Sequence, residues 1–403
     1  MLCAPDDEDD TMAHPVIRSP RLRRWLAVPA AAIALVVAAC APAANDAASS
    51  EPGTAVSAET IAQLKTEIAA GQEQPQWAAQ GPAFSVAGLA GKKILSMPVS
   101  SQLAGCDSMA RDVVEIAKSV GMTESTYFQN DGGPAAWVQG MNLAINQGFD
   151  GVALVCGIDP AALAPQMEAA KQAGMKVVDM HLADVSEAAS PLIAGQTNGQ
   201  FNDAMRKGVA AALVDANGNA IDALVITSNE NPPSIGMEQT VKDEFARLCK
   251  ECGVESINVP IPSYATDLSG AVRSALVRNP DIRAIFTVYD AQTPFVLPAI
   301  KASRVPAKTY AFGGDEQFVK LMADASNPMG TDMGPNFSWM AYTGADQLFR
   351  VVAGQPPIPA AQAYSPYRLW TPANVGEFTP PNFGFGDSFV DGYRSLWLDV
   401  PGA

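Results

Sequence analysis

From Lys92 onward, short apolar runs alternate with amphipathic segments that end at glycine, and this alternation limits the folds open to the chain. Residues 151–155 form one such run, and the segment 134–146 before it stops at Gly148. Strands that helices cover on both faces appear in a sequence as continuous apolar runs. The repeated pattern therefore predicts an α/β protein with two doubly wound parallel-sheet lobes, linked by right-handed crossovers.

The predicted elements follow one another in strand–helix order along most of the chain. Strands are predicted at 94–97, 123–129, 151–155, 176–180, 223–227, 255–259, 284–288 and 309–312. Helices are predicted at 107–120, 134–146, 160–173, 201–214, 236–252, 266–278 and 293–302.

Cys40 follows an apolar stretch, residues 25–37, that is preceded by four arginines between positions 18 and 24. A positive segment, an apolar segment and small residues before a cysteine are typical of a lipoprotein signal. We expect cleavage before Cys40 and lipid attachment to it, on the outer face of the cytoplasmic membrane. The alternatives are plain secretion and an uncleaved anchor, but the apolar run is shorter than the roughly 20 residues of a spanning helix.

The segments outside the alternating region have different predicted roles. Residues 1–39 are the predicted signal peptide, and the acidic residues among 1–11 favour Met12 as the true start. Residues 40–56 have the composition of a flexible tether, and residues 57–91 form an N-terminal extension that starts with a short amphipathic helix. Residues 356–403 are rich in proline, glycine and aromatic residues, and we expect them to pack on the lobes or the hinge.

The formal net charge of −16 disfavours nucleic acid and anionic lipid as partners. Apart from Cys3 and Cys40, four cysteines remain, an even number that suits an oxidising compartment. Cys249 and Cys252 have CxxC spacing without a second pair, which argues against zinc. A local disulfide and two free thiols both remain open for them.

Candidate binding residues come directly after the predicted strands, where ligands bind in open α/β sheets. They are Ser100, Ser101, Gln102, His181, Tyr289, Asp290 and Asp315. Each has a structural alternative: Asp290 and Asp315 can cap helices, and His181 can fill a hydrogen-bonding niche. These small, polar or acidic groups suit a neutral or cationic ligand.

Motifs for catalysis are missing from the sequence. It contains no GxSxG, no GxxxxGK[ST] phosphate loop and no HExxH, and the predicted body holds one histidine. We therefore expect no enzyme activity, no metal site and no cofactor.

Four local runs carry a resemblance to a known family. They are residues 146–152, 170–178, 279–286 and 312–315. With the order of the elements, they make residues 92–352 resemble the type I periplasmic binding proteins, specifically the ribose-binding-like solute receptors of ABC importers.

The resemblance implies a fold of two lobes joined by three crossovers, expected near Gly195, Pro335 and Gln355. The N-terminal lobe would comprise 92–195 and 336–355, and the C-terminal lobe 196–335. It also implies a monomer that traps a small solute by hinge closure and delivers it to the permease subunits of an ABC importer. The alternatives are a receptor that signals to a membrane kinase or chemoreceptor, and a hydrolase on the same fold. A lac-repressor-type regulator would need an N-terminal helix-turn-helix.

The sugar-binding pattern of the family is only partly present. Gln239 stands where the family has an arginine, His181 where it has an aspartate, and Tyr289 where it has an asparagine, whereas Asp315 matches. Asn336 lies next to the position of the hinge glutamine. Tyr289, Phe337 and Trp339 offer aromatic surface instead. The resemblance therefore implies a small sugar-like solute, or another small polar or aromatic-containing solute. Either it carries fewer hydroxyls than a free pentose, or it is a sugar held in a different way.

The resemblance also places Cys106 and Cys156 after neighbouring strands. We expect a disulfide between them at the rim of the cleft. The alternative is two separate buried thiols.

Overall fold

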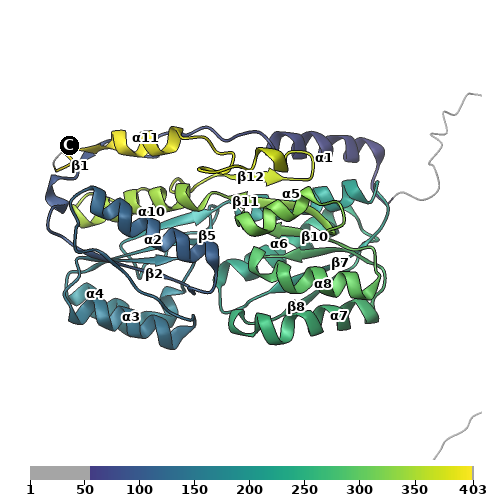
Figure 1. Cartoon of the computed structure of the whole chain (residues 1–403), viewed down its shortest axis with the longest axis horizontal. Coiled ribbons are helices and arrows are strands. Elements are labelled where there is room, and N and C mark those ends of the chain that lie inside the picture. Colours follow the sequence, from purple (N-terminus) through teal and green to yellow (C-terminus); the bar gives the residue numbers. More distant parts are fainter. Residues whose placement is uncertain (1–54, 402–403) are drawn as a thin grey trace, which may run out of the picture. The chain divides into compact units, whose positions relative to one another are not determined.

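Two open sheets organise residues 55–401, the part of the chain that the computed structural model describes (Figure 1). The predicted signal peptide and Cys40 lie outside these residues. No helix among the described residues has both the length and the apolar character to cross a membrane.

The first sheet is parallel throughout. Its strand order is β3 (Thr126–Tyr127), β2 (Ile94–Pro98), β4 (Gly151–Val155), β5 (Lys176–Asp184) and β6 (Gly195–Gly199). Helices α2 (Ala104–Ser119) and α10 (Phe337–Val352) pack together on one face, and α3 (Pro134–Asn146) and α4 (Ala164–Gln172) lie on the other (Figure 1). All five residues of β2 and of β4 are buried, as their apolar sequences predict.

The second sheet is parallel except for its last strand. Its order is β12 (Tyr367–Trp370), β11 (Met329–Pro335), β10 (Lys308–Phe312), β9 (Ile282–Thr287), β7 (Asp222–Thr227) and β8 (Val254–Asn258), with β12 antiparallel to β11. Its helices are α5 (Phe201–Asp215), α6 (Pro232–Leu248), α7 (Ser269–Arg278), α8 (Thr293–Ser303) and the short α9 (Glu316–Val319). Alternate residues of β7 pack into two different hydrophobic cores. Ala223 and Val225 pack with α5 and α6 on one face, and Leu224 and Ile226 pack with α7 and α8 on the other.

The N-terminal extension and the C-terminal tail pack on these layers and on each other. Helix α1 (Ala58–Gly71) packs against α5, α11 (Ser388–Leu396) packs against α10, and β1 (Phe84–Ser85) pairs with β13 (Trp397–Leu398). Arg368 joins the two segments, because its Nε donates to the carbonyl of Gln72 at 2.7 Å and one terminal nitrogen donates to the carbonyl of Gly384 at 2.8 Å.

Several short helical turns complete the described chain. The 3-10 turns are η1 (Ala87–Leu89), η2 (Pro160–Leu163), η3 (Ile261–Ser263), η5 (Asp290–Gln292), η6 (Lys320–Ala323) and η7 (Val375–Glu377), and η4 (Tyr264–Leu268) is a π turn. The helix predicted over 160–173 is divided into η2 and α4, because Pro165 lacks the N–H that a continuous helix would use there.

The chain passes from one sheet to the other at three places. It does so at Gln200, between β6 and α5, at Asn336, between β11 and α10, and within 353–366, before β12. Strands β6 and β11 were not predicted, because their sequences, GQTNG and MGTDMGP, carry no continuous apolar run. Only Thr126–Tyr127 of the strand predicted at 123–129 pairs with the sheet.

Candidate functional site

A cavity of about 280 Å³ lies at the carboxyl ends of strands from both sheets. The first sheet contributes the segments that follow β2 and β4, together with His181 of β5. The second contributes the segments that follow β7, β9, β10 and β11. The lining residues are Val99, Gln102, Leu103, Ala104, Gly105, Cys106, Cys156, His181, Phe201, Asn231, Pro233, Tyr289, Asp290, Ala291, Pro294, Phe295, Phe312, Gly313, Asp315, Gln317, Phe318, Pro335, Phe337 and Met340.

Half of the candidate residues from the sequence line this cavity. They are Gln102, His181, Tyr289, Asp290 and Asp315. The rule that ligands bind beyond the carboxyl ends of parallel strands therefore brings together residues more than 200 positions apart.

The other five candidates do not line the cavity. Ser100 is buried and accepts from the backbone N–H of Gln102 at 3.2 Å, and the Ser101 hydroxyl lies 2.6 Å from that of Tyr127. Gln239 is exposed and donates to Asp243, one turn further along α6. The structure thus places Gln239 on an outer helix face, away from the cavity.

Asn336 and Trp339 hold the start of α10. The side chain of Asn336 accepts from the backbone N–H of Trp339 at 2.8 Å and caps the helix, while its amide donates to the carbonyl of Asn382. The indole of Trp339 stacks on Phe389 with ring centroids 4.7 Å apart. Their neighbours Pro335 and Phe337 line the cavity instead, because the helix turns each successive side chain by about 100°.

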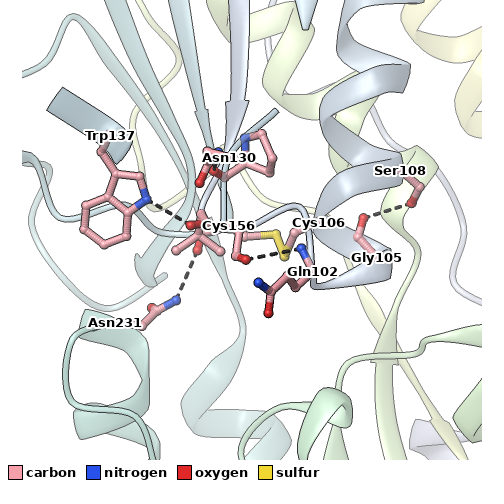
Figure 2. Close-up of a disulfide and its surroundings, with 11 residues drawn as sticks. Gln102, Gly105, Cys106, Ser108, Asn130, Trp137, Cys156 and Asn231 are labelled. Carbon is pink, nitrogen blue, oxygen red and sulfur yellow. Dashed lines mark hydrogen bonds between the residues drawn. A yellow bond between two sulfur atoms is a disulfide. The ribbon is translucent and has the colours of Figure 1, made fainter. Parts of the chain in front are cut away.

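The first-sheet wall contains a disulfide between Cys106 and Cys156, whose Cα atoms are 5.9 Å apart (Figure 2). It links the first turn of α2 to the residue after β4. Asn231, from the start of α6, donates to the carbonyl of Cys156 at 3.2 Å, as Figure 2 shows. A residue of the second sheet's helices is thus bonded directly to the disulfide-bearing wall. A second, local disulfide joins Cys249 to Cys252.

His181 and Cys156 both have a left-handed backbone, with φ of 67° and 68°. Such a conformation is uncommon for residues other than glycine and clusters at functional sites. The ring of His181 packs edge-on against Phe201 at 4.5 Å and stacks on Phe312 at 5.9 Å. Burial lowers the pKa of His181 to about 3, so the imidazole is neutral.

A buried carboxylate pair forms part of the second-sheet wall. Asp290 is 4% exposed and Asp332 is fully buried. One oxygen of Asp290 accepts from the backbone N–H of Asp315 at 2.7 Å, and one oxygen of Asp332 accepts from that of Gly314 at 3.1 Å. Burial and the neighbouring acid raise the pKa of Asp290, and burial raises the pKa of Asp332 to about 6.

Glycine is required beside this pair. A Cβ added to Gly313 would lie 2.6 Å from a carboxylate oxygen of Asp290, and Gly314 has a φ of 72°. The run Phe312-Gly313-Gly314-Asp315 therefore allows the backbone after β10 to pass directly against the acids.

The aromatic part of the lining was largely missed from the sequence. Phe201, Phe295, Phe312 and Phe318 lie at apolar positions typical of a core, and no local pattern separates them from core residues. Asn231 was also missed, although it directly follows Ser228-Asn229-Glu230, which comes after a predicted strand. Within residues 55–401, no group of three or more His, Cys, Asp or Glu side chains is placed to hold a metal ion.

Residues 94–356 match a family model described as "Periplasmic binding protein domain". No curated protein sequence matches the chain. Among solved structures, the chain is similar to an ABC sugar transporter subunit from Rhodobacter sphaeroides 2.4.1, with a TM-score of 0.61 and 18% identity, covering 71% of this chain and 100% of that chain.

Two further solved structures were determined with bound solutes. One is a 5-methylthioribose transporter solute-binding protein from Thermotoga lettingae TMO in complex with 5-methylthioribose, with a TM-score of 0.62, 16% identity and coverage of 81% of this chain and 97% of that chain. The other is a myo-inositol-binding protein from Caulobacter bound to myo-inositol, with a TM-score of 0.59, 16% identity and coverage of 74% and 98%. Identities this low establish a common fold and leave the solute of this chain open.

Proposed function

We propose that this chain, which belongs to the periplasmic binding protein domain family, is the extracytoplasmic solute receptor of an ABC importer and holds its solute in the cavity between the two sheets. The observation that carries the proposal is the lining itself, which both sheets contribute at the carboxyl ends of their strands. A solute held there touches both halves of the protein, so its binding energy favours the arrangement in which they are close.

The three passages of the chain between the sheets support a hinge mechanism. Short connections at Gln200 and Asn336, and a longer one within 353–366, can absorb a rotation while each sheet keeps its own core. In this proposal the permease recognises the solute-bound arrangement. The protein does not change the solute chemically.

The expected solute is small. A volume of about 280 Å³ lies just below the roughly 300–1,000 Å³ of typical ligand pockets. The many rings and few polar groups of the lining favour a solute with an apolar part, such as a substituted sugar or a polar compound that contains an aromatic ring. The 5-methylthioribose of one relative has both a sugar ring and an apolar methylthio group.

Membrane attachment through lipid on Cys40 is also part of the proposal. It rests on the arginines, the apolar stretch and the small residues before Cys40. A diacylated cysteine would keep the receptor close to its permease as a monomer. Replacing Cys40 with serine should release the protein from the membrane fraction, which metabolic labelling with a fatty acid would check directly.

A thermal-shift screen of the processed chain tests solute binding. At a hundred times its Kd, a true solute should stabilise the protein by about 2.7 kcal/mol, which raises Tm by several degrees. The substitution Ala104→Trp places a large ring at the cavity wall, on an exposed first residue of α2, and should abolish the shift.

Ala220→Trp is the matched control, because Ala220 is also exposed and borders a different cavity. A shift that survives Ala104→Trp would show that the solute binds elsewhere. Loss of solute uptake in a strain lacking the gene, restored by the wild-type chain, would support import. Retained uptake would support the sensing role instead.

A further inference from the structure

A quarter of the residues that line the cavity are aromatic. Its aromatic lining residues are Phe201, Tyr289, Phe295, Phe312, Phe318 and Phe337. The faces of such rings carry negative electrostatic potential, so they attract cations as well as apolar groups. An apolar body with a positive group fits these walls better than a molecule that is polar all round.

The charged groups of the lining are all acidic. Asp290 and Asp315 line the cavity, and no lysine or arginine is among the described residues that do so. His181 is neutral, because burial lowers its pKa to about 3. An anionic solute would therefore find no opposite charge in these walls.

Asp315 is already stabilised by backbone groups. Its carboxylate accepts from the backbone N–H of Gln317 at 3.2 Å and caps α9, and the N–H of Gly105 in the first turn of α2 lies near it and favours its charged form. Helix α2 has no side-chain cap of its own, so Asp315 supplies a negative charge to its N-terminus.

The surroundings of Asp290 differ from those of Asp315. Asp290 Oδ1 and Asp332 Oδ2 are buried and accept from no N–H or hydroxyl group among the described residues, so the two carboxyl groups can bond to each other only through a shared proton. The two carboxyl groups pack together without a basic side chain, so they repel each other unless a proton or a cation lies between or beside them. Asn231 Oδ1 is a further buried acceptor of the lining without such a partner, since its amide nitrogen donates to Cys156.

We propose that the solute is a small organic amine, with a positively charged nitrogen that donates to Asp290 and an apolar body that packs against the phenyl rings. This inference rests on the proposed function and names the solute class of the same cavity. A protonated amine carries several N–H donors and no acceptor, so it suits a carboxylate such as Asp290, where it can take the place of the proton shared with Asp332. Its charge also relieves the repulsion between Asp290 and Asp332.

A free sugar or polyol fits these walls less well. Each hydroxyl both donates and accepts, so a polyol needs polar groups on every side. Here most lining residues are apolar, and each hydroxyl left without a partner costs about 1–3 kcal/mol. The position where the resemblance expects a sugar-binding arginine holds Gln239, which is exposed on α6.

Matched pairs of amine and alcohol test the proposal on the unmodified chain. The probes are 2-phenylethylamine, 3-phenylpropylamine and cyclohexylmethylamine, each beside the alcohol of the same skeleton, together with ribose and myo-inositol. Isothermal titration should show at least one amine binding tenfold or more tightly than its alcohol and more tightly than either polyol. Equal binding of every pair would overturn the proposal.

Substitution of Asp290 tests whether its carboxylate causes the preference for an amine over its alcohol. Asp290→Asn keeps the size and an acceptor oxygen but removes the charge, so it should weaken the bound amine tenfold or more and leave the paired alcohol within twofold. Asp267→Asn removes the same charge from an exposed position on η4 and should change neither. Equal loss in both variants would show that overall charge, not Asp290, attracts the amine, and would overturn the proposal.

The comparison of amine and alcohol needs no variant, so it remains decisive if Asp290→Asn fails to fold. Binding of ribose or myo-inositol that exceeds every amine and is blocked by Ala104→Trp would overturn the amine and leave the solute-receptor function standing. Amine binding that Ala104→Trp leaves unchanged would place the site elsewhere, and both proposals would fall.

Discussion

The two walls of the cavity belong to sheets of the same class, yet their interiors are stabilised in different ways. The first-sheet wall is fixed by a disulfide between residues 50 positions apart, and α10 behind it contains a buried ion pair, Arg350–Asp346. The second-sheet wall contains two adjacent carboxyl groups without a basic partner, and the disulfide of this half, at the end of α6 away from the cavity, spans only three positions. The first wall is cross-linked and largely apolar, whereas the second contains two buried acids whose pKa values are raised. In the proposals above, the first wall shapes the cavity and the second selects the solute.

The largest expected effect comes from the buried ion pair behind the first wall. Arg350 is 2% exposed, donates to Asp346 at 2.8 Å and to the carbonyl of Pro82 at 2.9 Å, and lies over the ring of Phe84. The substitution Arg350→Met leaves Asp346 buried without its cation, so the free energy of unfolding should fall by about 3–5 kcal/mol. Urea denaturation measures this loss.

Lys118→Met is the control for that experiment. The Lys118–Glu115 pair is exposed, and its loss should cost less than about 1 kcal/mol. Ion pairs among the described residues of the second sheet and its helices likewise have at least one partner more than a third exposed. If Arg350→Met and Lys118→Met lose similar unfolding free energy, the buried ion pair does not distinguish the two regions.

The disulfide of the first sheet should also stabilise the protein more than the disulfide of the second. The difference in unfolding free energy should be smaller than the difference between the two ion pairs. Chain-entropy arguments give about 4 kcal/mol for a cross-link over a separation of 50 and about 1.6 kcal/mol for a separation of three. The double variant Cys106→Ala/Cys156→Ala should therefore lose more unfolding free energy than Cys249→Ala/Cys252→Ala, as measured in urea. It should also weaken solute binding, because both cysteines line the cavity. A larger loss in the 249/252 variant would reverse the comparison.

A fall in pH should change the stability that the two walls contribute in opposite directions. The contribution of His181 in the first wall decreases, and that of Asp332 in the second increases. The pKa of His181 is lowered from 6.5 to about 3, so the unfolded chain takes up a proton first and stability falls as pH drops from 6.5. The pKa of Asp332 is raised from 3.8 to about 6, so stability from this group is full below 3.8 and is lost as pH rises to 6. Each slope is at most about 1.4 kcal/mol per pH unit, and solvent in the cavity reduces that of His181.

Denaturation of two variants between pH 4 and 7 separates these slopes. Relative to the wild type, His181→Gln should gain stability as pH falls, and Asp332→Asn should gain stability as pH rises from 4 to 6. Parallel curves for a variant and the wild type would show that the corresponding group has the same pKa in the folded and unfolded chain.

The sequence anticipated much of the first sheet. Strand β4 and helix α3 have the predicted bounds, because a five-residue apolar run and a helix between proline and glycine are defined by local chemistry alone. Strands β6 and β11 escaped prediction, since glycine and polar residues are strand-like only once neighbouring strands satisfy their backbone. The tail strand β12 was missed for a different reason, because it is only four residues long and pairs with β11 from 32 positions away.

The candidate site divides along the same line. His181, Asp290 and Asp315 were identifiable because they directly follow apolar strands, where ligands bind in this class of sheet. Asp332 and the phenylalanines of the lining were not identifiable. No local sequence pattern distinguishes a functional acid in an unpredicted strand, or a phenylalanine that lines a cavity, from a core residue. Asn336 and Trp339 were expected at the cavity, whereas they hold the start of α10, because the phase of a helix decides which neighbour faces inward.

The sequence by itself determined the α/β class, the order of its strands and helices, the family to which the chain belongs and the strand ends at which a ligand would bind. Those features depend on the periodicity of apolar residues and on short local runs, which operate over a few residues. Only the tertiary structure decided that six aromatic side chains line the cavity, that Asp290 lies against Asp332, and that Asp315 lies at the start of α2. These are contacts between residues far apart in the chain, and their energies depend on burial and distance, which no local pattern contains.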